Sequence, residues 1–258
     1  MYPLIDSHAH LEELADLDSA IDMARQNGVV AIVAVGSDYE SNQRVLEIAG
    51  HYGGFVYAAL GLHPGTLDES LPLLDRDLRF IEDHLGETVG IGEVGLDYHK
   101  RVVARAGKEV QKDVFATVLR LAGRYNKPVI IHSRYAWRDC FTLTRAAGIG
   151  QAVFHWYTGP TNVLREILDR GYFVSATLAA EYHAEHRRAV KEAPLEQLLL
   201  ETDAPVFYRG HQSEPADVVR SLQALAELKA EPPEVVAAAT TANAVRLYGM
   251  ESVVDGGG

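Results

Sequence analysis

Residues 109–132 read EVQKDVFATVLRLAGRYNKPVIIH, a stretch that pairs an expected helix with an expected strand. Within Glu109–Tyr125 the apolar side chains recur at the 3.6-residue spacing of one helix face. Pro128–His132 is a short, β-branched apolar run that ends in a histidine. Continuous apolar runs of this length are typical of parallel strands that are buried on both faces. The stretch therefore predicts one helix-then-strand unit of an α/β fold.

The same alternation continues on both sides of this unit. Seven further apolar runs predict strands at Leu4–Ser7, Val29–Gly36, Phe55–Leu62, Val89–Val94, Ala152–His155, Tyr172–Ala176 and Leu198–Thr202. Helical patterns lie at Asp18–Asn27, Ser41–Tyr52, Leu71–His84, Trp137–Ala147, Asn162–Arg170, Glu185–Glu192, Pro215–Leu228 and Pro233–Leu247. Eight strands alternating with helices over about 250 residues predict a single (β/α)8 TIM barrel. An open doubly wound sheet is the alternative, but no Gly-x-Gly-x-x-Gly follows the first strand, which disfavours its nucleotide-binding form.

Composition and charge narrow the class of protein. The 258 residues include 24 Lys and Arg against 36 Asp and Glu, which gives a formal net charge of −12. This acidic balance argues against a protein that wraps a long duplex, because affinity for the phosphate backbone rests on Lys and Arg. No apolar stretch approaches the roughly 20 residues that span a bilayer, and no secretory signal opens the chain. We therefore expect a cytoplasmic protein with no membrane partner.

No linker, repeat or change of composition marks a second domain. Residues 1–258 are expected to form one barrel domain, with a flexible tail at residues 251–258. The single cysteine, Cys140, can form no internal disulfide and is expected to pack in its helix. The sequence carries no signal for an oligomeric state.

Polar side chains recur where the expected strands end, which is where a TIM barrel gathers its catalytic groups. The first strand runs into Asp6-Ser7-His8-Ala9-His10, and the alternation of extended chain places His8 and His10 on one side. Four other strands also carry a histidine or a carboxylate at this end. The full set is His8, His10, Glu93, His132, His155 and Asp203.

A metal centre explains these six side chains together. Taken singly, each histidine could be a satisfied core residue, and a buried Glu93 could be held by an arginine or by backbone amides. An uncompensated carboxylate among Gly, Val and Ile costs several kcal/mol, however, and neutral imidazoles are natural metal ligands. Six ligands exceed what one tetrahedral zinc needs. The sequence therefore predicts one or two divalent ions, with two ions sharing a carboxylate as the better count; imidazoles favour zinc, while carboxylates also accept magnesium or manganese.

The motifs along the chain resemble those of the TatD family of metal-dependent hydrolases, within the amidohydrolase-like barrels. The matching stretches are Asp6–Leu11, Gly61–Pro64, Gly92–Tyr98, Pro128–Arg134, Phe154–Gly159, Leu200–Pro205, Glu214-Pro215 and Asn243–Gly249. The resemblance implies that His8, His10 and Asp203 hold one ion, and that Glu93 bridges it to a second ion held by His132 and His155. It also implies metal-dependent DNase activity of the 3′-5′ exonuclease type.

Two positions depart from the family's pattern. Gly65 stands where another histidine is common, and Trp156-Tyr157-Thr158 stands where Cys-Phe-Ser is common. Both departures lie near the expected substrate rather than among the expected metal ligands. They therefore bear on which substrate the protein takes.

The expected mechanism is attack on a phosphodiester by a hydroxide held between the ions. Asp203, with Glu93, is assigned to catalysis, and Asp203 is the expected general base. Arg134 is expected to bind phosphate, because its guanidinium fork matches phosphate oxygens. His63, at the end of the third strand, is expected to donate a hydrogen bond to a phosphate or to the leaving group.

The basic segment 98–108 contains Arg101 and no acidic residue. It is either a solvated loop or a phosphate-binding lip for a DNA strand end or another small phosphorylated substrate. Tyr98, Trp156 and Tyr157 are candidates to stack on bases, although aromatic side chains of loops more often pack against the rim. The remaining histidines, which include His186, lie on expected helices or loops, and most of them are expected on the surface.

Two other function classes remain open. The same metal chemistry would serve an amide, ester or lactone hydrolase, or a D-aminoacyl-tRNA deacylase, which the family resemblance also suggests. A metal-binding scaffold without activity is disfavoured, because structural metal sites are usually closed.

Overall fold

The computed structural model describes residues 2–71 and 73–250. Eight parallel strands pair in chain order: β1 (Leu4–Ala9), β2 (Val29–Val35), β3 (Val56–Leu62), β4 (Thr88–Gly95), β5 (Val129–His132), β6 (Ala152–Phe154), β7 (Phe173–Ala176) and β8 (Leu198–Leu200). Beyond the end of β8, Ala204 forms a parallel bridge with Ala9, so the sheet nearly closes into a barrel. The predicted TIM barrel is confirmed.

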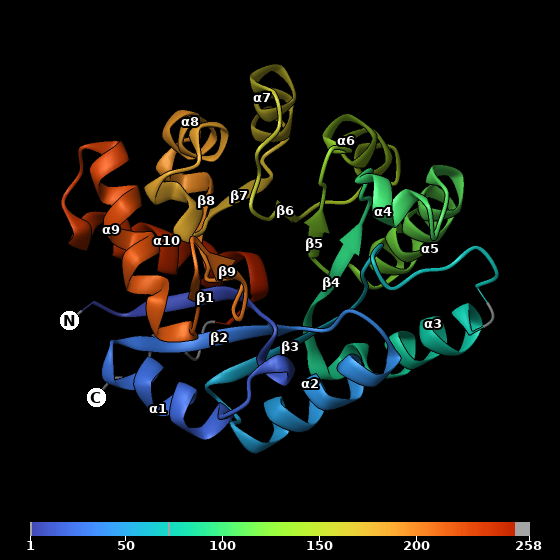
Figure 1. Ribbon diagram of the computed structural model, residues 1–258, viewed down its shortest axis with the longest axis horizontal. Coiled ribbons are helices and arrows are strands. Elements are labelled where there is room, and N and C mark those ends of the chain that lie inside the picture. The colour runs from blue at the N-terminus through green and yellow to red at the C-terminus, as the bar shows by residue number, and fades with distance from the viewer. Residues whose placement is uncertain (1, 72, 251–258) are drawn as a thin grey trace.

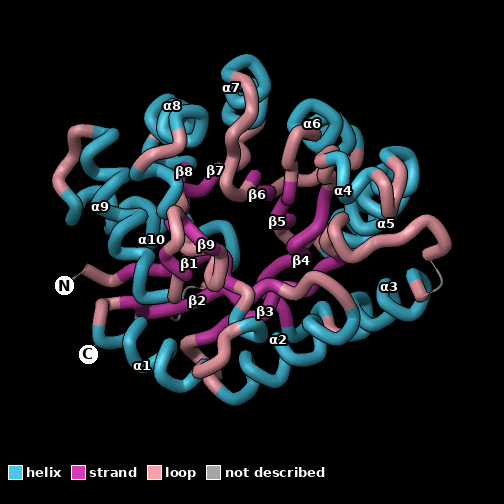
Figure 2. Tube along the Cα trace, viewed as in Figure 1, coloured by secondary structure: helices cyan, strands magenta, loops and turns pink. Residues whose placement is uncertain are grey.

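Helices surround the strands, as Figures 1 and 2 show. They are α1 (Leu17–Gln26), α2 (Tyr39–His51), α3 (Leu74–Asp83), α4 (Lys100–Val103), α5 (Lys108–Tyr125), α6 (Trp137–Ala146), α7 (Thr161–Asp169), α8 (Ala184–Glu192), α9 (Val218–Lys229) and α10 (Pro233–Tyr248). Short 3-10 turns lie at Leu11–Glu13, Leu85–Glu87, Leu178–Glu181, Leu195–Gln197 and Pro215–Asp217. Within the described residues, none of these helices has the length and apolar character needed to cross a membrane.

Two elements were not expected from the sequence. Helix α4 lies inside the basic segment, and a hairpin of β9 (Phe207–Tyr208) and β10 (His211–Gln212) follows β8. Elements of two to four residues are too short to produce a periodic apolar pattern. The predicted tail at 251–258 lies outside the described residues, and the single-domain organisation stays a prediction.

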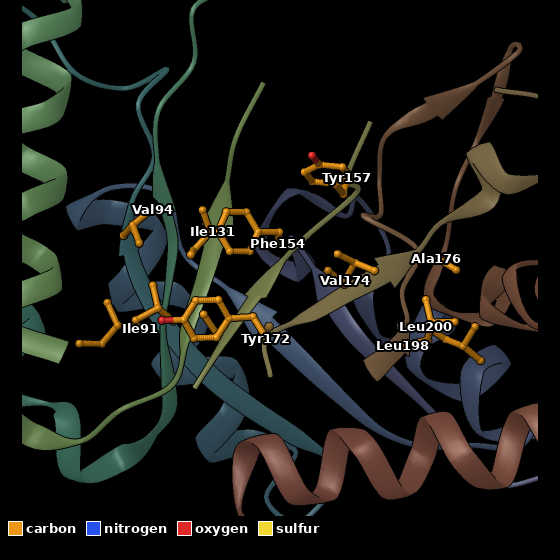
Figure 3. Close-up of a cluster of buried hydrophobic side chains, with 14 of the residues drawn as sticks. Ile91, Val94, Ile131, Phe154, Tyr157, Tyr172, Val174, Ala176, Leu198 and Leu200 are labelled. Atoms are coloured by element: carbon orange, nitrogen blue, oxygen red, sulfur yellow. The ribbon is translucent and has the colours of Figure 1, made fainter. Parts of the chain in front are cut away.

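The core has two layers because successive strand residues face opposite sides of the sheet. Ile131 belongs to the layer between strands and helices, and Figure 3 shows it beside Phe154 and other members of that layer. Its neighbour Ile130 belongs to the smaller cluster inside the barrel, with Val33 and Val153. The functional side chains described below lie at the carboxyl ends of the strands.

Candidate metal centre

Glu93, on β4, joins two sets of histidines in a buried cluster. Its side chain is 3% exposed. Its Oε1 lies 2.7 Å from Nδ1 of His132 and 2.7 Å from Nε2 of His155. Its Oε2 lies 3.4 Å from Nε2 of His10 and 3.6 Å from Nε2 of His8. A carboxylate whose two oxygens face separate sets of imidazoles has the arrangement of a bridging ligand.

The first ligand group consists of His8, His10, Asp203 and Oε2 of Glu93. Besides the Glu93 contacts, Nε2 of His8 and of His10 lie 3.4 Å apart, and Asp203 Oδ1 lies 3.3 Å and 3.6 Å from them. The edge of a tetrahedron with ligands ~2.1 Å from its centre is about 3.4 Å. The donor types and the spacing of this group therefore fit a divalent ion.

The second ligand group consists of His132, His155 and Oε1 of Glu93. Here both imidazoles contact the carboxylate directly, at hydrogen-bond distance. Burial opposes protonation of the two rings, but Glu93 raises the pKa of both histidines, that of His155 well above its ordinary value. Burial also opposes ionisation of Glu93, yet the surrounding histidines hold its pKa well below its ordinary value. The donors suit an ion, which would have to replace these hydrogen bonds.

His63, at the end of β3, lies beside the second group. Its Nε2 is 3.3 Å from Nδ1 of His132 and 3.8 Å from Oε1 of Glu93. Its Nδ1 accepts a hydrogen bond from the backbone N–H of Gly65 at 2.9 Å. Burial lowers the pKa of His63 to about 3, so the ring is neutral. Because Nδ1 is an acceptor, the proton of this neutral ring is on Nε2, which faces the cluster as a donor.

A carboxylate lies behind each of three cluster histidines, on the side away from Glu93. Asp97 Oδ2 lies 3.3 Å from Nε2 of His132, and Glu201 Oε1 lies 3.4 Å from Nδ1 of His155. Glu12 Oε1 lies 3.9 Å from Nδ1 of His10. A carboxylate that accepts a hydrogen bond from a metal-binding imidazole orients the ring and sets its tautomer. Of these three contacts, the one between Asp97 and His132 has hydrogen-bond geometry. Asp97 and Glu12 were missed from the sequence, although Asp97 follows Glu93 at an even spacing.

The connection between β1 and β8 positions the first group. Asp6 accepts hydrogen bonds from the backbone N–H and the hydroxyl of Thr202, at 2.9 Å and 2.6 Å. These bonds replace strand pairing, which explains why β8 ends at Leu200 rather than at Thr202 as predicted. The N–H of Asp203 then donates to the carbonyl of His8 at 3.0 Å. Burial raises the pKa of Asp203, with the nearby histidines opposing the shift.

Arg134 follows β5 at the rim of the cluster. Its Nε and Nη2 contact the two oxygens of Asp97 at 3.2 Å and 3.0 Å, while the side chain stays 49% exposed. Arg101 is exposed on α4, in the basic segment. That segment is ordered in part by Arg105, which donates to the carbonyl of Gly65 at 2.9 Å.

The positions predicted for Tyr157 and His186 are wrong. Tyr157 is 1% exposed, lies in the core (Figure 3), and donates its hydroxyl to the carbonyl of Pro160. It therefore has no open face on which a base could stack. His186 is buried, not on the surface, because its Nε2 accepts from the N–H of Thr177 and its Nδ1 donates to the carbonyl of Tyr157.

Comparison with known proteins adds an independent finding. A family model described as "TatD related DNase" matches residues 5–249. The uncharacterized metal-dependent hydrolase YabD of Bacillus subtilis is 34% identical over 95% of this chain and 98% of its own. The human deoxyribonuclease TATDN3 is 34% identical over 95% of this chain and 94% of its own. The crystal structure of YJJV, a TatD homolog of Escherichia coli, has a TM-score of 0.86 at 29% identity, covering 95% of this chain and 98% of that one.

Proposed function

The chain belongs to the family of TatD related DNases, which are metal-dependent hydrolases, and we propose that it hydrolyses DNA phosphodiesters, releasing nucleotides from the 3′ end of a single strand. The observation that supports this proposal is the position of Glu93, because its two carboxylate oxygens face two separate ligand groups. Paired ions suit displacement at phosphorus, because they stabilise both the attacking and the leaving oxygen.

The ions would be held by the two ligand groups, with Glu93 shared between them. Zn²⁺, Mn²⁺ and Mg²⁺ are all candidates, and the histidines favour Zn²⁺. When bound, such ions acidify water and neutralise charge that develops on a phosphate. Side chains of the protein carry out proton transfer and phosphate binding.

Asp203 acts as the general base. It faces His8 and His10 through Oδ1, so Oδ2 can accept the proton of the attacking water. His63 donates from Nε2 to the phosphate or to the leaving oxygen, since Gly65 holds its other nitrogen as an acceptor. Arg134 binds a phosphate oxygen with the edge of its guanidinium that Asp97 does not occupy. Arg101, which is exposed on α4, extends this positive surface along the bound DNA strand.

A strand-end assay tests the proposal. Protein loaded separately with Zn²⁺, Mn²⁺ or Mg²⁺ is incubated with a 5′-labelled single-stranded oligonucleotide. We expect progressive shortening from the 3′ end, blocked by a 3′-terminal phosphorothioate and abolished in Asp203→Ala and Glu93→Ala. RNA, D-aminoacyl-tRNA, and model esters and lactones are run in parallel. Turnover of one of these with an intact DNA strand would overturn the proposal, and equal turnover in both variants would remove the assigned site.

A further inference from the structure

Asp97 connects the metal cluster to the surface of the barrel mouth. Its carboxylate contacts the His132 ring on one side and the Arg134 guanidinium on the other. It also accepts a hydrogen bond from the backbone N–H of His99 at 2.7 Å. These three contacts hold the carboxylate in one position. One rigid group therefore places both Arg134 and the start of the basic segment relative to His132.

Tyr135 follows Arg134 in the chain and presents an open aromatic ring. The side chain is 59% exposed. The turn that carries it is held at both ends, since Ala136 N–H donates to the Ser133 carbonyl at 3.1 Å and Tyr98 N–H donates to the Arg134 carbonyl at 2.9 Å. The backbone of Tyr135 is left-handed, with φ of 58°. A bulky residue rarely adopts this conformation, and where it does, the strain is often kept for function.

Two other aromatic rings lie near the Tyr135 ring. The His99 ring lies nearly parallel to it, at 24° and a centroid distance of 6.4 Å. Trp137 meets it edge-on, with centroids 5.9 Å apart at 72°. The backbone N–H of His99 donates to Asp97, and the Arg134 guanidinium donates to the same carboxylate. Asp97 therefore positions both the guanidinium and the residue whose ring lies near Tyr135.

We propose that Arg134 and Tyr135 form a nucleotide subsite, in which Arg134 binds a backbone phosphate and the ring of Tyr135 stacks on the attached base. This inference rests on the proposed function and specifies it: the substrate is recognised through its bases as well as its phosphates. Exposed aromatic rings next to cationic side chains bind single strands without sequence preference, because every base offers a π-face. The subsite therefore distinguishes a polynucleotide from a small phosphorylated molecule that has no base.

The other aromatic side chains considered from the sequence are engaged elsewhere. Tyr98 donates its hydroxyl to Asp139 and lies under Lys108. Trp156 packs on Tyr208, with ring centroids 5.2 Å apart. Tyr135, in contrast, is exposed and directly follows Arg134 in the sequence.

The test compares two single-stranded oligonucleotides of equal length and charge. One carries normal bases throughout, and the other has abasic residues at its three 3′-terminal positions. Wild type, Tyr135→Ala and Tyr135→Phe are assayed after loading with the ion that supports turnover. We expect Tyr135→Ala to raise KM for the normal strand about tenfold, within the range that base–aromatic stacking provides. KM for the abasic strand stays at the wild-type value, and Tyr135→Phe behaves as wild type on both strands.

Two control variants locate the effect. Tyr125→Ala removes an exposed tyrosine at the end of α5, just before β5 and therefore at the opposite end of the barrel. Phe207→Ala removes an exposed ring from the β9–β10 hairpin. Both should leave the preference for the normal strand unchanged. A preference that depends on Phe207 rather than Tyr135, or equal KM rises on both strands in Tyr135→Ala, would overturn the subsite.

Failure of the proposed function is distinguished by a binding measurement. Anisotropy of the two labelled strands is recorded with the metal-loaded proteins whether or not they cleave. Base-dependent binding that Tyr135→Ala abolishes, in a protein that cuts neither strand, supports the subsite and refutes the exonuclease. Cleavage without any base dependence supports the exonuclease and refutes the subsite.

Discussion

The two ligand groups on either side of Glu93 are built differently. In the first group, the two imidazole nitrogens lie 3.4 Å from each other and 3.3–3.6 Å from the carboxylate oxygens of Glu93 and Asp203, close to the spacing around a tetrahedral ion. In the second group, His132 and His155 hydrogen-bond directly to the carboxylate at 2.7 Å. The first group is thus spaced for an ion in advance, whereas the second must exchange hydrogen bonds for ion contacts. We expect the second ion to bind more weakly and to depend more on its outer carboxylates.

Glu93→Gln provides the largest expected effect, because both groups share this side chain. Activity should fall by at least about 10³-fold, the upper range for losing one charge-stabilising group, and both ions should be lost on dialysis. Asp203→Asn, in contrast, should release the first ion and retain the second. Metal content by plasma mass spectrometry checks both variants. A Glu93→Gln protein that keeps the wild-type number of ions would show that the carboxylate does not bridge.

His186 tests what burial does to a histidine outside the cluster. Burial lowers its pKa to about 4, whereas an unfolded histidine has a pKa near 6.5. Below pH ~6.5 the histidine takes up a proton in the unfolded chain but stays neutral in the folded chain. The free energy of unfolding therefore decreases as the pH falls from ~6.5 toward 4. The loss should reach about 3 kcal/mol. Urea unfolding of wild type and His186→Gln across this range measures it, and parallel pH profiles for the two proteins would contradict the assignment.

Asp97→Asn should weaken the second group selectively. Outer partners of ligand histidines typically contribute about 10- to 100-fold in metal affinity, and we expect that loss for the second ion only. KM should rise as well, since Arg134 loses its charged anchor. Asp139→Asn is the matched control, because Asp139 contacts Tyr98 and Lys112 but no cluster histidine in the described chain. Titration calorimetry would count against this role if the first ion were the one weakened.

Gly65→Ala should give the smallest effect. It tests whether His63 acts as a hydrogen-bond donor to the substrate or as a metal ligand. A Cβ at this position would lie 2.9 Å from Nδ1 of His63, so the ring must move. We expect kcat to fall about threefold to tenfold, as for a side chain displaced from its preferred rotamer by ~1 kcal/mol. Ion content should not change. Gly86→Ala, where a Cβ meets nothing within 4 Å, is the control. Loss of an ion from Gly65→Ala would identify His63 as a ligand instead.

Strand ends were the part of the site most open to prediction from sequence. His8 and His10 alternate along one strand, and Glu93 interrupts an apolar run, so local patterns identify these residues. Glu12 lies in a 3-10 turn, where alternation no longer holds, and its approach to His10 follows only from the turn. Tyr157 was assigned to the substrate because it follows β6, but the chain after β6 turns its side chain into the core.

The sequence by itself determined the barrel and the residue types at its mouth, because strand and helix periods, and the cost of burying charge, are local properties. Tertiary structure alone decided how Glu93 divides its oxygens between two histidine sets, and that Asp97 joins His132 to Arg134. It also decided that Tyr135, rather than Tyr157, is exposed at the rim. These outcomes depend on which atoms of distant strands meet, and on the backbone conformation of single residues after each strand, which no periodic pattern encodes.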